Sequence, residues 1–240
     1  MPLAILLDLD DTLYDETAYM RSGFAAVAIG IADMAGYAPG KVLEVLLDIE
    51  RREGRGHVFD TALAAFGLAA DPRVVQDLVA VYRSHRPQIQ LYAGVRELLA
   101  RLHRRGRTAI VTDGLPQMQR HKVAALDLEA AVDAIVYTWE LAAPKPDPAS
   151  YLAALAKLGA APADAVVIGD NPHHDMAAAR AIGARAIRVR TGRFAQVPTP
   201  LGAEPDLEIA GIGELEAALD ALGPHTRSRP LLAEGVAVHA

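Results

Sequence analysis

Residues 6–14 form the stretch LLDLDDTLY, in which an apolar run ends abruptly in Asp8, Asp10 and Asp11. Carboxylates this close in the chain repel one another unless a positive group lies among them. The apolar run itself, residues 3–9, is short and almost uninterrupted, which is typical of a parallel strand buried on both faces. We therefore expect a central strand with a cluster of negative charge at its carboxyl end.

Five further segments have the character of strands, and helical patterns separate several of them. They are residues 108–114, 133–138, 164–171 and 184–189, with residues 205–211 as an edge strand. Amphipathic helices are predicted over residues 95–105, 149–158 and 173–182, and a glycine follows each of them. Strands that alternate with single helices predict an α/β fold with a doubly wound, Rossmann-like parallel sheet.

Residues 15–90 break this alternation, because their apolar residues follow helical patterns and form no convincing strand. We interpret this region as a helical cap inserted after the first strand, above the carboxyl ends of the strands, where ligands bind in such sheets. Residues 1–14 and 91–223 would then form the Rossmann-like catalytic core. Residues 224–240 have no clear periodicity, so we expect a peripheral tail.

The overall composition excludes several classes of function. The 240 residues are 52% hydrophobic, which is ample for a core, and none is a cysteine, which excludes disulfides and thiolate metal sites. The formal net charge of -6 disfavours a nucleic acid polymer as partner. The N-terminal apolar run lacks a basic leader and is too short to span a membrane, so we expect a cytoplasmic protein with no membrane partner. We expect the protein to be a monomer or a homodimer.

Polar residues follow three of the predicted strands at their carboxyl ends. They are Asp8, Asp10 and Thr12 after the first strand, Thr112, Asp113 and Gly114 after the second, and Asp170, Asn171 and Asp175 after the fourth. Because the carboxyl ends of parallel strands meet at one edge of the sheet, we expect the carboxylates to converge there. Oxygen ligands suit a hard divalent cation such as Mg²⁺, and Lys145, framed by Pro144 and Pro146, can supply further positive charge. A carboxylate held in this way can attack an electrophile such as phosphorus.

Four short motifs carry these residues in order along the chain: DLDDT at residues 8–12, VTDG at 111–114, PKPDP at 144–148 and IGDNPHHD at 168–175. Together they resemble the motifs of the haloacid dehalogenase-like hydrolase superfamily, whose first motif is DxDx[TV] and whose fourth is GDxxxD. The resemblance covers roughly residues 3–189. A helical insertion directly after the first motif resembles the C1 type of cap in that superfamily.

The resemblance implies a role for each catalytic residue. Asp8 would be the nucleophile that forms an aspartyl-phosphate, and Asp10 would first protonate the leaving alkoxide and then deprotonate the hydrolytic water. Thr12 would fix the local turn, and Thr112 would hydrogen-bond to the phosphoryl oxygens. Lys145 would offset the negative charge on Asp8 and on the phosphate.

The resemblance also implies the ligands of Mg²⁺ and the groups that hold the substrate. The metal would be bound by Asp8, the backbone carbonyl of Asp10 and Asp170, with Asp175 acting behind them or through a water molecule. The backbone N–H groups of Asp113 and Gly114 would help to bind the phosphoryl group. Asn171, also among the substrate-binding residues, would orient the network around Asp175 with its side chain.

Asp10 separates the reactions within this superfamily, because its dehalogenases lack the second aspartate and need no Mg²⁺. The resemblance therefore favours a Mg²⁺-dependent phosphatase that acts on a small phosphomonoester, such as a sugar phosphate or a nucleoside monophosphate. A sugar phosphomutase shares Asp10 and is an alternative. A receiver-like signalling domain also phosphorylates an aspartate, but it would be much shorter and would lack the helical insertion.

Some of these residues have a simpler explanation when each is taken singly. Asp11, Asp113 and Asp175 are of a type common in turns and at helix N-termini. His173 and His174 are adjacent, so on a helix they point about 100° apart and are expected at the surface rather than on one metal.

Residues of the insertion are candidates for contact with the substrate. They are Arg55, His57, Arg83, His85 and Arg86, although arginines at helix ends are commonly solvated. Tyr14 and Glu16 follow the first motif, where they would line the entrance or form a hinge.

Overall fold

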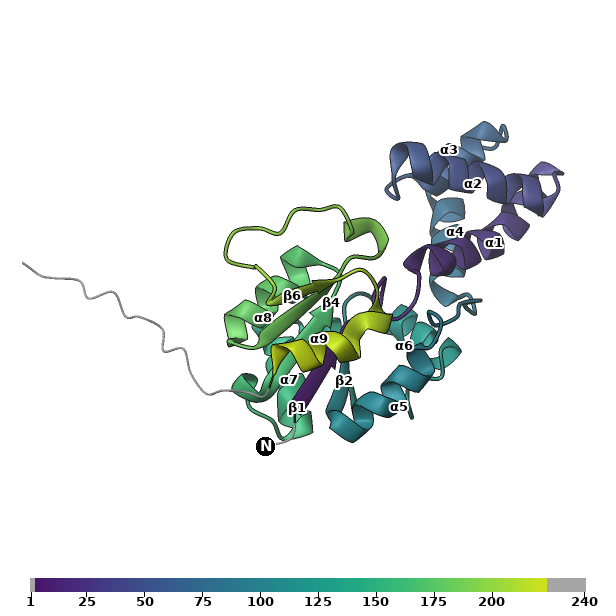
Figure 1. The fold of residues 1–240 in the computed structure, drawn as a ribbon. Coiled ribbons are helices and arrows are strands. Elements are labelled where there is room, and N and C mark those ends of the chain that lie inside the picture. Colours follow the sequence, from purple (N-terminus) through teal and green to yellow (C-terminus); the bar gives the residue numbers. More distant parts are fainter. Residues whose placement is uncertain (1–2, 224–240) are drawn as a thin grey trace, which may run out of the picture.

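The computed structural model describes residues 3–223, so the predicted tail at residues 224–240 lies outside the described residues. A parallel sheet lies at its centre, with the strand order β3-β2-β1-β4-β5-β6 (Figure 1). The strands are β1 (Leu3–Leu7), β2 (Gly106–Thr112), β3 (Ala134–Tyr137), β4 (Ala165–Gly169), β5 (Arg185–Val189) and β6 (Leu207–Ile209). The predicted α/β fold with a doubly wound, Rossmann-like sheet is confirmed.

β1 occupies the middle of the sheet, between β2 and β4. Leu7 on β1 lies opposite Ile110 on β2 and Ile168 on β4. The chain adds β2 and β3 on one side of β1 and then β4, β5 and β6 on the other, so the strand order reverses at β1. In such sheets a crevice opens at the carboxyl ends beside this reversal, and the residues directly after β1 lie in it.

Five of the six strands end one or two residues earlier than predicted. β1 ends at Leu7 rather than at residue 9, because the N–H of Leu13 donates to the carbonyl of Leu9 at 3.0 Å and draws residues 9–13 into a turn. The polar residues that follow the strands therefore stand in loops beyond the edge of the sheet, where their side chains can meet one another.

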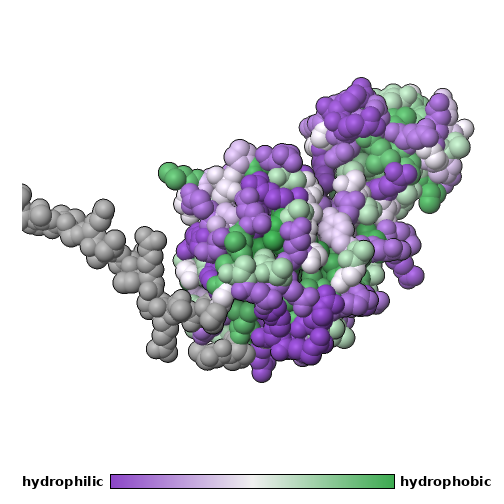
Figure 2. All heavy atoms as spheres, in the orientation of Figure 1, coloured by the Kyte–Doolittle hydropathy of each residue, from purple (hydrophilic) through white to green (hydrophobic). Residues whose placement is uncertain are grey.

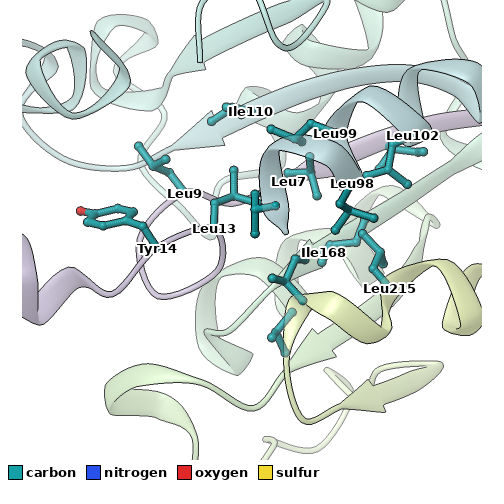
Figure 3. Close-up of a cluster of buried hydrophobic side chains, with 14 of the residues drawn as sticks. Leu7, Leu9, Leu13, Tyr14, Leu98, Leu99, Leu102, Ile110, Ile168 and Leu215 are labelled. Carbon is teal, nitrogen blue, oxygen red and sulfur yellow. The ribbon is translucent and has the colours of Figure 1, made fainter. Parts of the chain in front are cut away.

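Helices cover both faces of the sheet, because neighbouring residues of a strand point to opposite sides. On one face Leu7 packs with α5 (Val95–Arg105) and α9 (Leu215–Leu222), as Figure 3 shows. On the other face Leu6 packs with residues of α7 (Pro148–Leu158) and α8 (Ala177–Ile182). α6 (Pro116–Ala125) follows β2, and short 3-10 turns lie at Thr138–Leu141, Pro162–Asp164, Gly192–Phe194 and Ile212–Glu214.

Four helices lie between β1 and α5, and we call them the helical unit. They are α1 (Glu16–Ala35), α2 (Pro39–Glu53), α3 (Val58–Ala65) and α4 (Pro72–Ser84). Their buried apolar residues, among them Phe24, Val27 and Leu46, form a core separate from that of the sheet. In Figures 1 and 2 the helical unit stands beside the sheet and is joined to it by a narrower neck.

Two chain segments form this neck and pair with each other. Tyr14 forms a bridge with Leu91, and the N–H of Tyr92 donates to the carbonyl of Leu13 at 2.9 Å. The helical unit is thereby placed directly beyond the loop that follows β1. Across residues 3–223, no helix has both the length and the apolar character needed to cross a membrane.

Arg188 on β5 is fully buried and fastens a loop to the edge of the sheet. Its guanidinium donates to the carbonyl oxygens of Phe194 and Val197 and to the hydroxyl of Thr199, each at 2.7 Å. A longer bond of 3.3 Å reaches the carbonyl of Asp170, directly after β4. One buried cation therefore holds residues 194–199 against the strand ends.

Replacing Arg188 by methionine should lower the free energy of unfolding by at least about 2 kcal/mol, because buried carbonyl groups would lose a charged donor. Chemical denaturation of Arg188→Met beside the unchanged protein measures this difference. Arg107→Met, at an exposed position of β2, is the matched control and should change the free energy by no more than about 0.5 kcal/mol. Equal stability of the two variants would contradict a structural role for Arg188.

Candidate active site

Asp8 is the first residue after β1 and lies at the wall of a cavity. Its N–H donates to the carbonyl of Ile168 at 2.8 Å, which continues the pairing of β1 with β4. Its carboxylate accepts the hydroxyl of Thr12 at 3.1 Å and the ammonium of Lys145 at 2.5 Å. Only 8% of Asp8 is exposed, so these donors hold a nearly buried carboxylate in one place.

Asp170 and Asp175 lie beside Asp8, and carboxylate oxygens of the three residues come within 4.8 Å of one another. Asp170 follows β4 directly. Asp175 returns to the strand end because Pro172–Met176 form a wide π-helical turn, where the sequence predicted the start of an α-helix. Gly169 leaves room for this return, since a Cβ atom there would stand 2.3 Å from Oδ2 of Asp175.

Lys145 joins this cluster from the loop before α7. Its ammonium lies 2.5 Å from Asp8 Oδ1 and 2.7 Å from Asp175 Oδ1. Asp175 also accepts the hydroxyl of Tyr151 at 2.7 Å and the N–H of Asn171 at 3.2 Å. Protein donors thus surround the Asp175 carboxylate.

The cluster contains three carboxyl groups and one ammonium. Burial raises the pKa of Asp8 to about 7, against the lowering effect of Lys145. Burial, followed by the charges of Asp8 and Asp175, raises the pKa of Asp170 to about 9. Burial disfavours the charged form of Lys145, but Asp175 and Asp8 outweigh it and raise the pKa of the ammonium well above its usual range. Lys145 is therefore charged at neutral pH, and its single charge does not balance three carboxylates.

A divalent cation fits this arrangement. Its donor atoms are carboxylate oxygens, which hard cations prefer. Asp170 forms no ion pair with any side chain of residues 3–223, and burial together with the charges of Asp8 and Asp175 outweighs the lowering effect of Lys145 on its pKa. The Asp175 carboxylate accepts three protein donors, the Asp8 carboxylate two and, among the described residues, the Asp170 carboxylate none, so Asp8 and Asp170 would hold the cation directly.

Asp10 lies at the same cavity, but its side chain is held apart from the three converging carboxylates. Its Oδ1 accepts the ammonium of Lys122 at 2.7 Å and the hydroxyl of Tyr14. The next residue, Asp11, has a φ of +56°, a left-handed conformation that aspartate tolerates. The Asp11 carboxylate accepts the backbone N–H groups of Glu16, at the start of α1, and of Arg193, in the loop after β5, so it ties these segments to the loop after β1.

The loop after β2 holds the loop that carries Lys145 in place and forms part of the cavity wall. Thr112 is fully buried and its hydroxyl donates to the side-chain oxygen of Gln119 at 3.0 Å, so the structure does not bring Thr112 to the cavity wall. The carboxylate of Asp113 accepts the N–H of Lys145 at 3.0 Å, which fixes the loop that carries the ammonium. Gly114, with a φ of +119°, lines the cavity.

The cavity has a volume of about 360 Å³, which suits a small molecule. The predicted site residues on its wall are Asp8, Asp10, Asp113, Gly114, Lys145, Asp170, Asn171 and Asp175. The helical unit contributes Glu16, Tyr19, Arg55 and Tyr82. The cavity therefore has a charged side formed by the strand ends and a second side formed by the helical unit.

The five residues of the insertion that the sequence suggested as substrate contacts do not all lie at the cavity. Arg55 reaches the cavity, where its guanidinium forms two bonds of 3.1 and 3.2 Å with the carboxylate of Glu16. Arg83 borders a neighbouring, more apolar cavity. The remaining three line neither of these cavities: His57, His85 and Arg86. His174 lies on the wall beside Asn171, where burial lowers its pKa, and neither it nor His173 belongs to the carboxylate cluster.

Lys122 and Gln119 on α6 are the main site residues that sequence reasoning missed. They are three residues apart and therefore lie on one face of the helix, behind Asp10 and Thr112. The available signal was a polar pair at helical spacing directly after VTDG. Arg193 and Phe194, which line the cavity from the loop after β5, carried no comparable pattern.

Comparison with known proteins gives a consistent set of similarities. A model of the haloacid dehalogenase-like hydrolase family matches residues 2–183. The phosphoserine phosphatase of Thermus thermophilus is 33% identical over 162 residues, which cover 67% of this chain and 63% of that protein, just under two thirds of its length. The glyceraldehyde 3-phosphate phosphatase of Methanopyrus kandleri is 27% identical over 216 residues, covering 86% of this chain and 92% of that protein. The crystal structure of 2-haloacid dehalogenase from Pseudomonas syringae superposes with a TM-score of 0.64 and 25% identity, covering 92% of this chain and all of that one.

Without a bound cation, the protein should lose stability as the pH rises between 3.8 and about 9. Above the ordinary carboxyl pKa of 3.8, the folded protein keeps protons on Asp8 and Asp170 that the unfolded chain has already released. The state that binds more protons is favoured at low pH, so the free energy of unfolding declines until both raised pKa values have been passed. Thermal unfolding in EDTA over a pH series measures the decline, and Asp170→Asn should flatten it.

A divalent cation should oppose this decline, because it binds the ionised carboxylates and only in the folded state. Added Mg²⁺ should therefore raise the melting temperature more at about pH 8 than at about pH 5. Asp170→Asn should abolish most of this rise, whereas Asp33→Asn, at an exposed position of α1, should preserve it. A rise that is the same in both variants would place the cation elsewhere.

Proposed function

This chain belongs to the haloacid dehalogenase-like hydrolase family. On that basis we propose that it is a phosphoric monoester hydrolase, a Mg²⁺-dependent phosphatase that forms an aspartyl-phosphate on Asp8. One observation carries the proposal. The Asp8 carboxylate, held by Thr12 and Lys145, shares a cavity wall with a second carboxylate two residues along the chain. A nucleophile and a separate acid or base within one small cavity are the groups that phosphate ester hydrolysis needs.

In the first half of the reaction, an oxygen of Asp8 attacks the phosphorus atom and the bond from phosphorus to the leaving oxygen breaks. Asp10 gives its proton to that oxygen, so an alcohol departs. In the second half, water attacks the phosphorus atom of the aspartyl-phosphate, Asp10 takes a proton from the water, and the bond from phosphorus to the Asp8 oxygen breaks. Inorganic phosphate is released, and both carboxylates return to their starting states.

Electrostatic support for these steps comes from groups already fixed in place. The ammonium of Lys145, 2.5 Å from Asp8, offsets the charge that gathers when a phosphate approaches a carboxylate. The backbone N–H groups of Asp113 and Gly114 and the side chain of Asn171 are the proposed contacts with the phosphoryl group. Thr112, whose hydroxyl donates to Gln119 and lies away from the cavity wall, would instead support the loop after β2. When bound by Asp8 and Asp170, Mg²⁺ would supply positive charge to the phosphoryl oxygens.

The helical unit would act as a cap of the C1 type over this site, with residues 15–90 as the cap and residues 1–14 and 91–223 as the core. Two features support this division. Tyr19, Arg55 and Tyr82 of the helical unit form part of the cavity wall, and the paired neck segments are its covalent connection to the core. A cap in this position selects substrates by size and shields the reaction from water. The cavity volume of about 360 Å³ supports a small phosphomonoester, such as a sugar phosphate or a nucleoside monophosphate.

Replacing Asp8 by asparagine should abolish turnover, because the amide cannot attack phosphorus. Asp10→Asn should lower kcat by about 10²- to 10⁴-fold, the usual contribution of general acid–base catalysis. Asp33→Asn is the matched control and should retain full activity. Release of inorganic phosphate from a panel of phosphomonoesters, including phosphoserine and glyceraldehyde 3-phosphate, is the measurement. Near-normal turnover by Asp8→Asn would refute the assignment of the nucleophile.

The same panel of phosphomonoesters tests the requirement for Mg²⁺ and distinguishes a phosphatase from a sugar phosphomutase. Activity should disappear in EDTA and return with Mg²⁺. A sugar phosphomutase would instead convert one sugar phosphate into its isomer while inorganic phosphate stays constant, which chromatography of the products detects.

A further inference from the structure

The Asp10 carboxylate is bound asymmetrically. Its Oδ1 accepts two donors, the ammonium of Lys122 at 2.7 Å and the hydroxyl of Tyr14. Among residues 3–223, no hydrogen bond ends on Oδ2. The side chain of Asp10 is 23% exposed and lies at the cavity wall, so the unbonded oxygen is available to a ligand.

Lys122 is not a solvated surface lysine. Its side chain is only 3% exposed, and its sole ion pair within the described part of the chain is with Asp10. The ammonium also lies 4.4 Å from the centre of the Tyr19 ring, in the first turn of α1. Burying an ammonium costs free energy unless the group is paired, so the position of this side chain depends on Asp10 and Tyr19 together.

Tyr14 supplies the second donor from the neck. It is fully buried in the core beside α5, and its backbone forms bridges with Asp10 and Leu91. Its ring therefore cannot follow Asp10 if that side chain rotates. The two donors approach from different elements, α6 and the neck, and together they define one orientation of the carboxylate.

We propose that Lys122 and Tyr14 are positioning residues that fix which oxygen of Asp10 faces the substrate, an inference that rests on the proposed role of Asp10 as the acid and base. Donors on Oδ1 make it the acceptor oxygen of the protonated carboxyl, so the proton resides on Oδ2. That proton passes from Oδ2 to the leaving oxygen as the bond to phosphorus breaks, and Oδ2 later takes a proton from the attacking water. Lys122 and Tyr14 keep their own protons throughout.

The contact with Tyr19 extends this role to the helical unit. Lys122 belongs to the core, whereas Tyr19 belongs to α1, so one ammonium touches both the acid–base carboxylate and the helical unit. A shift of α1 relative to α6 changes the surroundings of Lys122 and, through it, the orientation of Asp10. The position of the helical unit is thereby coupled to proton transfer.

The leaving group provides a test that separates positioning of Asp10 from direct binding of substrate. Phenyl phosphate and 4-nitrophenyl phosphate differ little in size, but phenolate is the more basic leaving group and needs the proton from Asp10 more. Release of the phenol in a single turnover reports the first half of the reaction alone. The variants are Lys122→Met, Lys122→Arg and Tyr14→Phe, with Lys157→Met on the exposed surface of α7 as control.

Lys122→Met should slow release from phenyl phosphate by about 10- to 100-fold, because a misplaced catalytic group commonly costs up to about that factor. Release from 4-nitrophenyl phosphate should slow much less, and KM should hardly change. Lys122→Arg should recover most of the rate, since it restores a charged donor to Oδ1. Tyr14→Phe should show the same dependence on the leaving group with a smaller loss, and Lys157→Met should match the unchanged protein.

Other outcomes overturn the inference. An equal loss with both esters, or a raised KM with unchanged kcat, would show that Lys122 binds the substrate instead of orienting Asp10. If Lys122→Met fails to fold, as judged by circular dichroism, Tyr14→Phe decides alone, because it removes a single oxygen atom from a side chain that otherwise stays in place. Failure of the unchanged protein to release phenol from either ester, together with failure to release inorganic phosphate from every member of the panel, would instead refute the proposed function, and the role of Asp10 with it.

Discussion

The ammonium of Lys145 lies between the carboxylates of Asp8 and Asp175 in a space almost closed to water, and the rest of the site depends on this contact. A buried carboxylate without a partner would be protonated or would destabilise the fold. Lys145 satisfies two of the three carboxylates and leaves Asp170 with a strongly raised pKa. The protein therefore folds with a local excess of negative charge that a cation or a protonated carboxyl must offset. This is also why one small region of the molecule governs both its chemistry and its dependence on pH.

Groups that touch no ligand hold this charged cluster together. The Asp113 carboxylate fixes the backbone of Lys145, and the missing side chain of Gly169 lets Asp175 return to the strand end. Arg188 reaches the carbonyl of Asp170 from β5 while it holds the loop that carries Phe194. Each contact joins the end of one strand to the end of its neighbour or to an adjoining loop. The site residues are therefore held in position by contacts along the whole sheet edge rather than by any single motif.

The helical unit gives the site its second side. Arg55 and Glu16 face each other at the cavity wall, and Tyr19 packs against the ammonium that binds Asp10. In the proposed reaction, the groups directed at the phosphate come from the strand ends, whereas helices inserted after β1 would surround the remainder of the substrate. This separation explains how one set of strand-end carboxylates can serve substrates of different shapes, since the wall that surrounds the rest of the substrate is encoded elsewhere in the chain.

The amino-acid sequence by itself was enough to predict the parallel sheet and the strand ends where polar residues gather. Short apolar runs followed by Asp8, Thr112 and Asp170 carry this information locally, and parallel strands bring their carboxyl ends to one edge whatever the intervening chain does. The tertiary structure alone decided where individual side chains point. Thr112 turns toward Gln119, and Lys122 turns toward Asp10, because α6 packs beside these loops in one particular orientation. The direction of Lys122 depends on a contact between segments more than a hundred residues apart, and no spacing within a single motif encodes it.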